Sequence, residues 1–217
     1  MKQWLISSVW LLACIAMQAQ EFPSQKFHRG QVTLTDGGVL SGQIKYDLNS
    51  EVILLKQNDK NGISTLNASQ FQSFVISAGP NAGVRTFYSI PVLNETGYRR
   101  PRIFELIAQG KVSLIAREFI ATRSSSANRS IYRRSIYDPY YVPATSLMTY
   151  QFLAYELWLI DENAELTELG NSRSDVIKAF DSHHSELRKY IKKEKLKVEK
   201  LLDLKRLVDY YNSLDTL

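Results

Sequence analysis

Arginine and tyrosine side chains gather in one long segment of the sequence, residues 122–148, which has no regular pattern of apolar residues. An arginine guanidinium pairs with anions and stacks on aromatic rings, and a tyrosine offers both a ring and a hydroxyl. These residue types together are typical of a surface that binds an anionic partner. The residues predicted to form it are Arg123, Arg129, Tyr132, Arg133, Arg134 and Tyr137.

The same segment is also explained as a solvated surface loop whose tyrosines cover the edge of the β-structure. Long loops of this kind are often disordered rather than functional. If the loop binds a partner, the export signal described below argues against nucleic acid. It favours a polysaccharide, a phospholipid headgroup or an acidic protein.

Histidine occurs at three positions, His28, His183 and His184. Consecutive residues on a helix point about 100° apart, so His183 and His184 cannot chelate one ion as residues four apart would. His184 falls among apolar residues at helical spacing, which predicts a packed histidine. His183 could approach Glu186, but a third ligand is missing, so we expect no metal site.

Common catalytic motifs are missing from the sequence. No serine lies in a Gly-x-Ser-x-Gly motif, and Gly79–Gly83 is not followed by the Lys-Ser/Thr of a phosphate-binding loop. Leu166 stands where a calcium loop needs glycine. We therefore expect no catalytic residue and no cofactor. The alternative is a hydrolase whose site is scattered over loops, where acids such as Asp138 and Glu156 could serve.

The N-terminus has the pattern of a secretory signal peptide over residues 1–20. Lys2 precedes an almost wholly apolar run, Trp4–Met17, and small residues follow, so we expect cleavage near Ala19 or Gln20. The run is shorter than the roughly 20 residues of a membrane-spanning helix, and no later stretch is long enough, so we expect no transmembrane span. Cys14 leaves an alternative open, because the residues before it resemble a lipobox and would make the chain an outer-membrane lipoprotein.

Charge is unevenly distributed along the chain, whose formal net charge is +5. Tyr98–Arg134 is strongly basic, whereas Tyr155–Gly170 contains acids and no base. A folded chain could therefore carry a basic face and an acidic face.

A β-hairpin is predicted over Arg102–Ala121, with apolar residues on both faces of both arms and Gly110 giving the turn its backbone freedom. Alternating or β-branched segments separated by turn residues predict further strands. Their ranges are 31–35, 39–46, 51–56, 63–66, 71–77, 85–92, 149–160 and 165–169.

The period changes after residue 170. Apolar residues from Val176 to Ile191 follow helical spacing, with Ser172 or Ser174 as the cap, and a second helix is predicted over Leu201–Leu214. The expected fold class is α+β, an antiparallel β sandwich or roll of about ten strands followed by a C-terminal two-helix unit. We divide the chain into a signal peptide (1–20), a β-rich domain (21–170, long loop 122–148) and a helical unit packed on it (171–217).

Three segments, Gly110–Leu114, Tyr190–Leu196 and Asp203–Asn212, resemble a group of uncharacterised secreted proteins of Gram-negative bacteria. The resemblance covers Arg102–Leu217 best. It implies a β-rich N-terminal part and a closing helix pair, and it brings no assigned activity.

From these patterns we expect a non-catalytic exported protein of the periplasm or cell surface. It would bind or scaffold an unknown envelope protein or a polyanion, and it could contact a membrane surface peripherally. We expect no nucleic acid among its partners. The envelope hydrolase and the outer-membrane lipoprotein are the alternatives.

Overall fold

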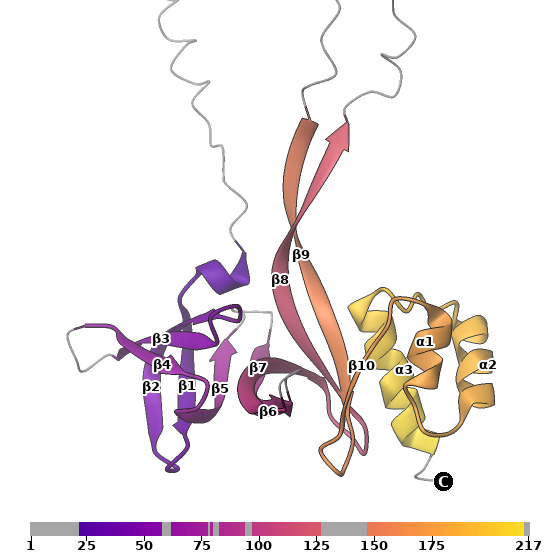
Figure 1. The fold of residues 1–217 in the computed structure, drawn as a ribbon, viewed down its shortest axis with the longest axis horizontal. Helices are drawn as coiled ribbons and strands as arrows, with labels where there is room; N and C mark the ends of the chain where they lie inside the picture. Colours follow the sequence, from indigo (N-terminus) through magenta and orange to yellow (C-terminus); the bar gives the residue numbers. More distant parts are fainter. Residues whose placement is uncertain are drawn as a thin grey trace, which may run out of the picture.

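A computed structural model describes residues 22–57, 62–77, 79, 83–93, 97–126 and 147–214. Within these residues the chain forms one ten-stranded antiparallel sheet followed by three α-helices (Figure 1). The strand order is β10-β9-β8-β7-β6-β5-β1-β2-β3-β4. The expected α+β class, with an antiparallel sheet followed by helices, is confirmed.

Most strands follow the predicted segments closely, because each has apolar residues that the sheet buries. The bounds of the strands are β1 His28–Leu34, β2 Val39–Asp47, β3 Val52–Gln57, β4 Ser64–Asn67, β5 Phe71–Ser77, β6 Val84–Leu93, β7 Arg99–Ala108, β8 Ser113–Ser126, β9 Leu147–Ile160 and β10 Leu166–Glu168. The exceptions are β7, which begins before the predicted hairpin, and β8 and β9, which extend into both ends of the predicted loop 122–148. A short 3-10 helix, Pro23–Gln25, precedes β1.

The sheet bends so that its first strands face its later ones across a hydrophobic core. In Figure 1, β1–β5 lie to one side and β6–β7 form the bend. Apolar side chains from β1, β2, β3, β5, β6 and β7 form this core, and the rings of Phe74 and Phe87 stack at 4.5 Å within it. Burial of these side chains is the main force that closes the bend.

The predicted hairpin Arg102–Ala121 is formed by β7 and β8, but the two strands stay paired over only part of their length. Their register runs from Glu105↔Ala116 to Ala108↔Leu114, with a bulge between Leu106 and Ala108. β8 then continues with β9 as a two-stranded ribbon, to the pair Ser126↔Leu147 (Figure 1).

Gly110 is required for a different reason from the one expected. Its φ is not positive. Instead, a Cβ at this position would lie 2.2 Å from the Asn212 side-chain nitrogen, so the glycine makes room for the last helix. Asn212 in turn accepts the Val112 N–H at 2.9 Å and donates to the Val112 carbonyl at 2.8 Å.

The predicted first helix is divided into α1 (Arg173–Lys178) and α2 (His184–Glu194), so three helices stand where two were expected. His183, immediately before α2, has a φ of 57°, which a right-handed helix cannot contain. Ser172 caps α1, as one of the two expected alternatives, and α3 spans Leu201–Leu214 as predicted.

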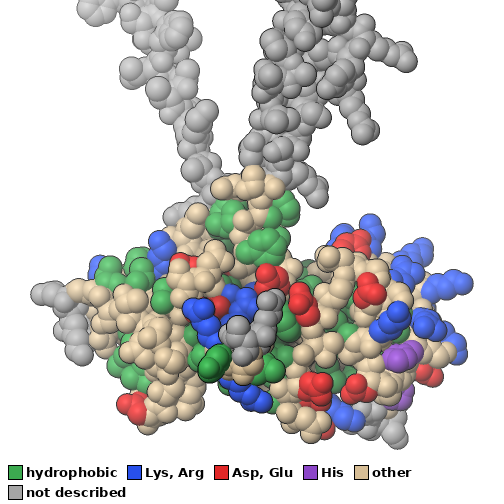
Figure 2. Space-filling model, viewed as in Figure 1, with side chains coloured by type: hydrophobic (Ala, Val, Ile, Leu, Met, Phe, Trp, Pro, Cys, Tyr) green, Lys and Arg blue, Asp and Glu red, His purple; other side chains and the backbone are tan. Residues whose placement is uncertain are grey.

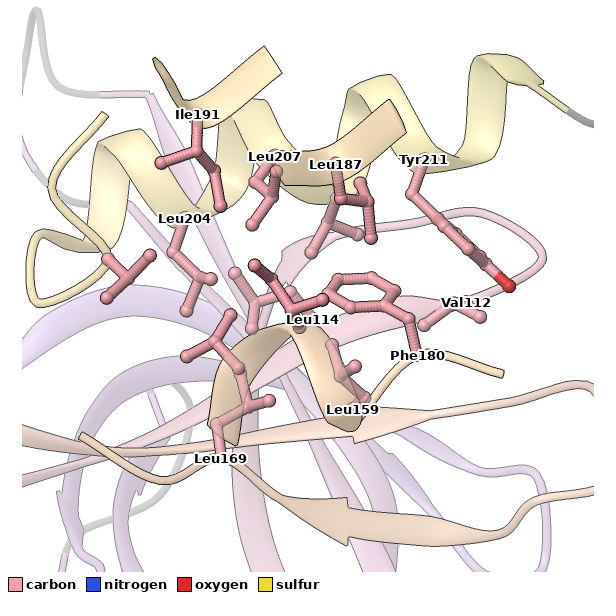
Figure 3. Close-up of a cluster of buried hydrophobic side chains, with 14 of the residues drawn as sticks. Val112, Leu114, Leu159, Leu169, Phe180, Leu187, Ile191, Leu204, Leu207 and Tyr211 are labelled. Atoms are coloured by element: carbon pink, nitrogen blue, oxygen red, sulfur yellow. The ribbon is translucent and has the colours of Figure 1, made fainter. Parts of the chain in front are cut away.

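A second core joins the helices to β7, β8 and β9 and to Leu169, which follows β10. Figure 3 shows Phe180, Leu187 and Leu207 pointing toward Leu114 and Leu159 of the sheet. All five side chains are buried. Of the helices in the described part of the chain, none has the length and apolar composition to span a membrane.

Candidate anion-binding pocket

The point at which β8 leaves β7 exposes the backbone of Ile103. Two side chains make the hydrogen bonds to Ile103 that a neighbouring strand would otherwise make. The Glu51 carboxylate accepts the Ile103 N–H at 2.7 Å, and Arg117 Nη1 donates to the Ile103 carbonyl at 2.8 Å. A buried backbone group without a partner costs stability, so this pair of side chains makes the separation of the strands tolerable.

Arg117 and Glu51 are themselves an ion pair, with Nη2 and Oε1 2.8 Å apart and side-chain exposures of 6% and 9%. Arg117 also donates to the Leu48 carbonyl and lies over the Phe104 ring, 5.5 Å from its centroid. Both η nitrogens of Arg117 are therefore engaged inside the protein. Arg117 contributes positive charge at this point of the sheet and holds Glu51 in place.

A pocket of ≈ 340 Å³ opens beside this ion pair. Its walls come from the β2–β3 turn, the β6–β7 hairpin and β8. The lining residues are Asn49, Glu51, Val92, Leu93, Arg100, Arg102 and Arg117. Three guanidinium groups thus share one pocket with a single carboxylate, which gives the lining a formal charge of +2 (three minus one).

Arg102 and Arg100 are the arginines whose donors are open to a ligand. Arg102 donates one long hydrogen bond from Nε to Glu51 at 3.4 Å, whereas its Nη2 lies 3.7 Å from Glu156, beyond hydrogen-bond distance, so its η nitrogens are the open donors. Arg100 is exposed and forms no ion pair with any residue of the described segments. The two arginines are two positions apart on β7 and share one face of it. Such a pair suits a carboxylate or a phosphate, which guanidinium groups bind with two parallel hydrogen bonds.

Glu156 lies at the edge of this arrangement. Its Oε2 is 3.7 Å from both Arg102 and Arg117, and its side chain is 44% exposed. It is the acid that the hydrolase alternative named together with Asp138, which lies outside the described residues. Glu156 balances part of the local positive charge.

A second buried network holds the bend of the sheet together. Arg85 of β6 bonds both oxygens of Glu105 at 2.7 Å, one oxygen of Glu118 at 2.7 Å and the Tyr46 hydroxyl at 2.9 Å. Tyr46 donates to Glu118. Burial raises the pKa of Tyr46, against the opposing charge of Arg85. Arg85 has a raised pKa despite its burial, because Glu105 bonds to it and stabilises its charge.

This network ties β2, β6, β7 and β8 together and leaves Arg85 with carboxylate partners on both sides. Its role is therefore to stabilise the bend of the sheet. The basic pocket lies on the other face of β7, since Glu105 and Arg102 are an odd number of positions apart.

Most residues of the predicted loop surface, namely Arg129, Tyr132, Arg133, Arg134 and Tyr137, lie outside the described residues. Arg123 belongs to β8, where its backbone pairs with Tyr150. Their role in binding stays a prediction. The histidines do not come together with the pocket: His184 Nε2 lies 2.6 Å from the Phe180 carbonyl, as expected of a packed histidine.

Sequence reasoning overlooked Arg100 and Arg102, although both lie in the basic segment Tyr98–Arg134. The signal was their spacing of two, which places two guanidinium groups on one face of a strand. It was missed because the predicted strand began at Arg102, whereas β7 begins at Arg99. Glu51 and Arg117 could not be found in this way, because they meet across 66 residues of chain.

No protein-family model, curated protein or solved structure matches the chain. The assignment of function therefore starts from the geometry of the pocket.

Proposed function

We propose that the protein is a non-catalytic binding protein that holds a polyanionic partner through its carboxylate or phosphate groups. The observation that carries this proposal is the pocket in which Arg100, Arg102 and Arg117 surround one carboxylate. Arg100 and Arg102 would donate to the anion. Arg117 would add positive charge at the buried side of the pocket while it keeps its hydrogen bonds to Ile103 and Glu51.

Binding is favoured over proton transfer by the state of the carboxylate in the pocket. Glu51 accepts from Ile103, from Arg117 and from Arg102, so its oxygens are already committed to hydrogen bonds. A general acid or base needs an oxygen that can reach the reacting proton. Glu51 is placed to orient two arginines instead.

Export to the periplasm or cell surface belongs to the same proposal and rests on the N-terminal pattern of residues 1–20. It is tested by the mass of the N-terminus of the native protein. We expect a chain that begins near Gln20 or Glu21. A diacylated Cys14 would support the lipoprotein instead, and an intact Met1 would contradict both.

The binding test uses polygalacturonate, a polyanion of carboxylates, and inorganic phosphate as a small competitor. We expect the double variant Arg100→Ser, Arg102→Ser to bind polygalacturonate roughly tenfold more weakly, with a flatter dependence on salt. Melting should change little, because exposed or partly exposed ion pairs contribute about 1 kcal/mol or less. Inorganic phosphate should displace the polymer from the wild-type protein.

The matched control is Arg99→Ser. Arg99 neighbours Arg100 in β7 and is also exposed, but it does not line the pocket. Equal binding by the double variant and the control would reject the pocket. If the variant with Arg129, Arg133 and Arg134 replaced by Ser loses binding while the double variant keeps it, the loop surface is the binding site.

A further inference from the structure

The outer edge of β9 is covered by β10 over a short part of its length. β10 pairs with Trp158, Leu159 and Ile160, and the last bond is from the Leu169 N–H to the Leu157 carbonyl at 2.8 Å. The chain then leaves the edge toward α1. Beyond Leu157, no described residue pairs with this side of β9.

The direction of the Leu157 carbonyl fixes which backbone groups face the open edge. In a strand, the N–H and C=O of one residue point to the same side, and neighbouring residues alternate. Leu153 and Tyr155 therefore present their N–H and C=O groups to the open edge, in line with Leu157. A row of unpaired donors and acceptors is a template for another strand.

A groove of ≈ 450 Å³ with apolar side chains on two of its walls runs beside this edge. On the sheet side it is lined by Leu153, Tyr155 and Leu157, and on the helical side by Val176, Leu201 and Leu204. Side chains of an added strand would point alternately into this groove and away from it. The groove therefore favours a segment with apolar residues at every second position.

The charged residues that line the groove are all acidic: Glu156, Glu168 and Glu199. Glu168 and Glu199 are exposed. Figure 2 shows acidic side chains where the strands meet the helical unit, while basic side chains gather over the outer helix at the right. The negative charge of these glutamates favours a bound segment that carries lysine or arginine. Two copies of the protein paired edge to edge along β9 would bring these glutamates together, which disfavours self-association.

We propose that the open edge of β9 binds an extended segment of a partner protein by strand addition, and that this segment alternates apolar residues with lysine or arginine. Backbone hydrogen bonds to Leu153 and Tyr155 supply the affinity, and the groove selects the apolar positions. Glu168 pairs with Trp158, so its side chain lies on the face of the sheet opposite to Leu157, where it selects the charge of the alternate positions. Glu156 borders both this site and the arginine pocket, but the proposal does not rest on the pocket.

The test uses the full chain and a synthetic peptide of about seven residues, acetyl-Lys-Val-Thr-Val-Lys-Val-Thr-amide, at low salt. We expect slower hydrogen exchange of the Leu153 and Tyr155 amides when the peptide is added. Two N-methylated peptides, one methylated at its valines and one at the other positions, serve as backbone probes. Since alternate N–H groups of a strand point to opposite edges, one of the two should lose binding and the other should retain it.

The protein variant is Glu168→Lys, which we expect to weaken peptide binding roughly tenfold. Its matched control is Glu162→Lys, an exposed acid in the β9–β10 turn that does not line the groove. Equal binding by both methylated peptides, binding without protection of Leu153 and Tyr155, or no binding would each overturn the proposal. Protection of these amides by raising the protein concentration alone would assign the edge to a second copy and overturn it too.

Discussion

The Glu51 carboxylate accepts a hydrogen bond from the backbone nitrogen of Ile103 at 2.7 Å, across 52 residues of chain. This contact lies at the place where β8 turns away from β7 to pair with β9 alone. The basic pocket and the ribbon both depend on that separation. Glu51 therefore links the fold of the sheet to the arginines that we propose bind an anion.

Replacing Glu51 with alanine should destabilise the protein by about 3–5 kcal/mol. The change leaves the Ile103 N–H without a partner and Arg117 buried with an uncompensated charge. Urea denaturation measures the free energy of unfolding. Glu156→Ala is the control, since its ion pairs at 3.7 Å are half-exposed and should contribute about 1 kcal/mol or less. Equal losses in both variants would show that Glu51 does not support the strand separation.

Gly110 and Asn212 should be coupled in a double-mutant cycle. Gly110→Ala alone should destabilise, because its Cβ would lie 2.2 Å from the Asn212 side chain. Asn212→Ala alone should cost about 1–3 kcal/mol, because the Val112 N–H and C=O lose their partner. In the double variant the clash disappears, so its destabilisation should be less than the sum of the two single effects. Additive effects would contradict the close approach of α3 to this turn.

Phe180→Ala and Leu207→Ala should each lower stability by about 2–5 kcal/mol, as truncations in the core between the helices and the sheet. The two side chains are 2% and 0% exposed. Leu202 lies on the same helix as Leu207 but is 74% exposed, so Leu202→Ala should change stability by about 0.5 kcal/mol or less. Wild-type melting of both core variants would mean that the helices are held by a partner rather than by the sheet.

Stability should fall at alkaline pH partly because of Tyr46. Its raised pKa keeps the phenol protonated in the folded protein, whereas the tyrosine of the unfolded chain ionises near pH 10. Above about pH 10 the unfolded state therefore binds fewer protons, and its stability relative to the folded state rises. Tyr46→Phe should reduce the slope of unfolding free energy against pH between about 9 and 11. An unchanged slope would show that Tyr46 does not contribute.

The strands and the second long helix could be predicted from the sequence because their signals are local. Val32 and Leu34 alternate with polar residues, and Leu204, Leu207 and Tyr211 recur at helical spacing. The division of the first predicted helix was not visible. Phe180 and Leu187 keep an apolar pattern across the break, and the left-handed backbone of His183 leaves no mark in hydrophobic spacing.

The sequence by itself also determined that basic residues gather over Tyr98–Arg134 and acidic ones over Tyr155–Gly170. Only the tertiary structure decided which of them share a site. Glu51 reaches Arg102 and Arg117 because the sheet bends and β8 separates from β7. Arg102 is 51 positions from Glu51 in the sequence, and Arg117 is 66 positions from it. Burial in the bend drives that approach, and burial depends on the whole chain, so no local pattern of residue types records it.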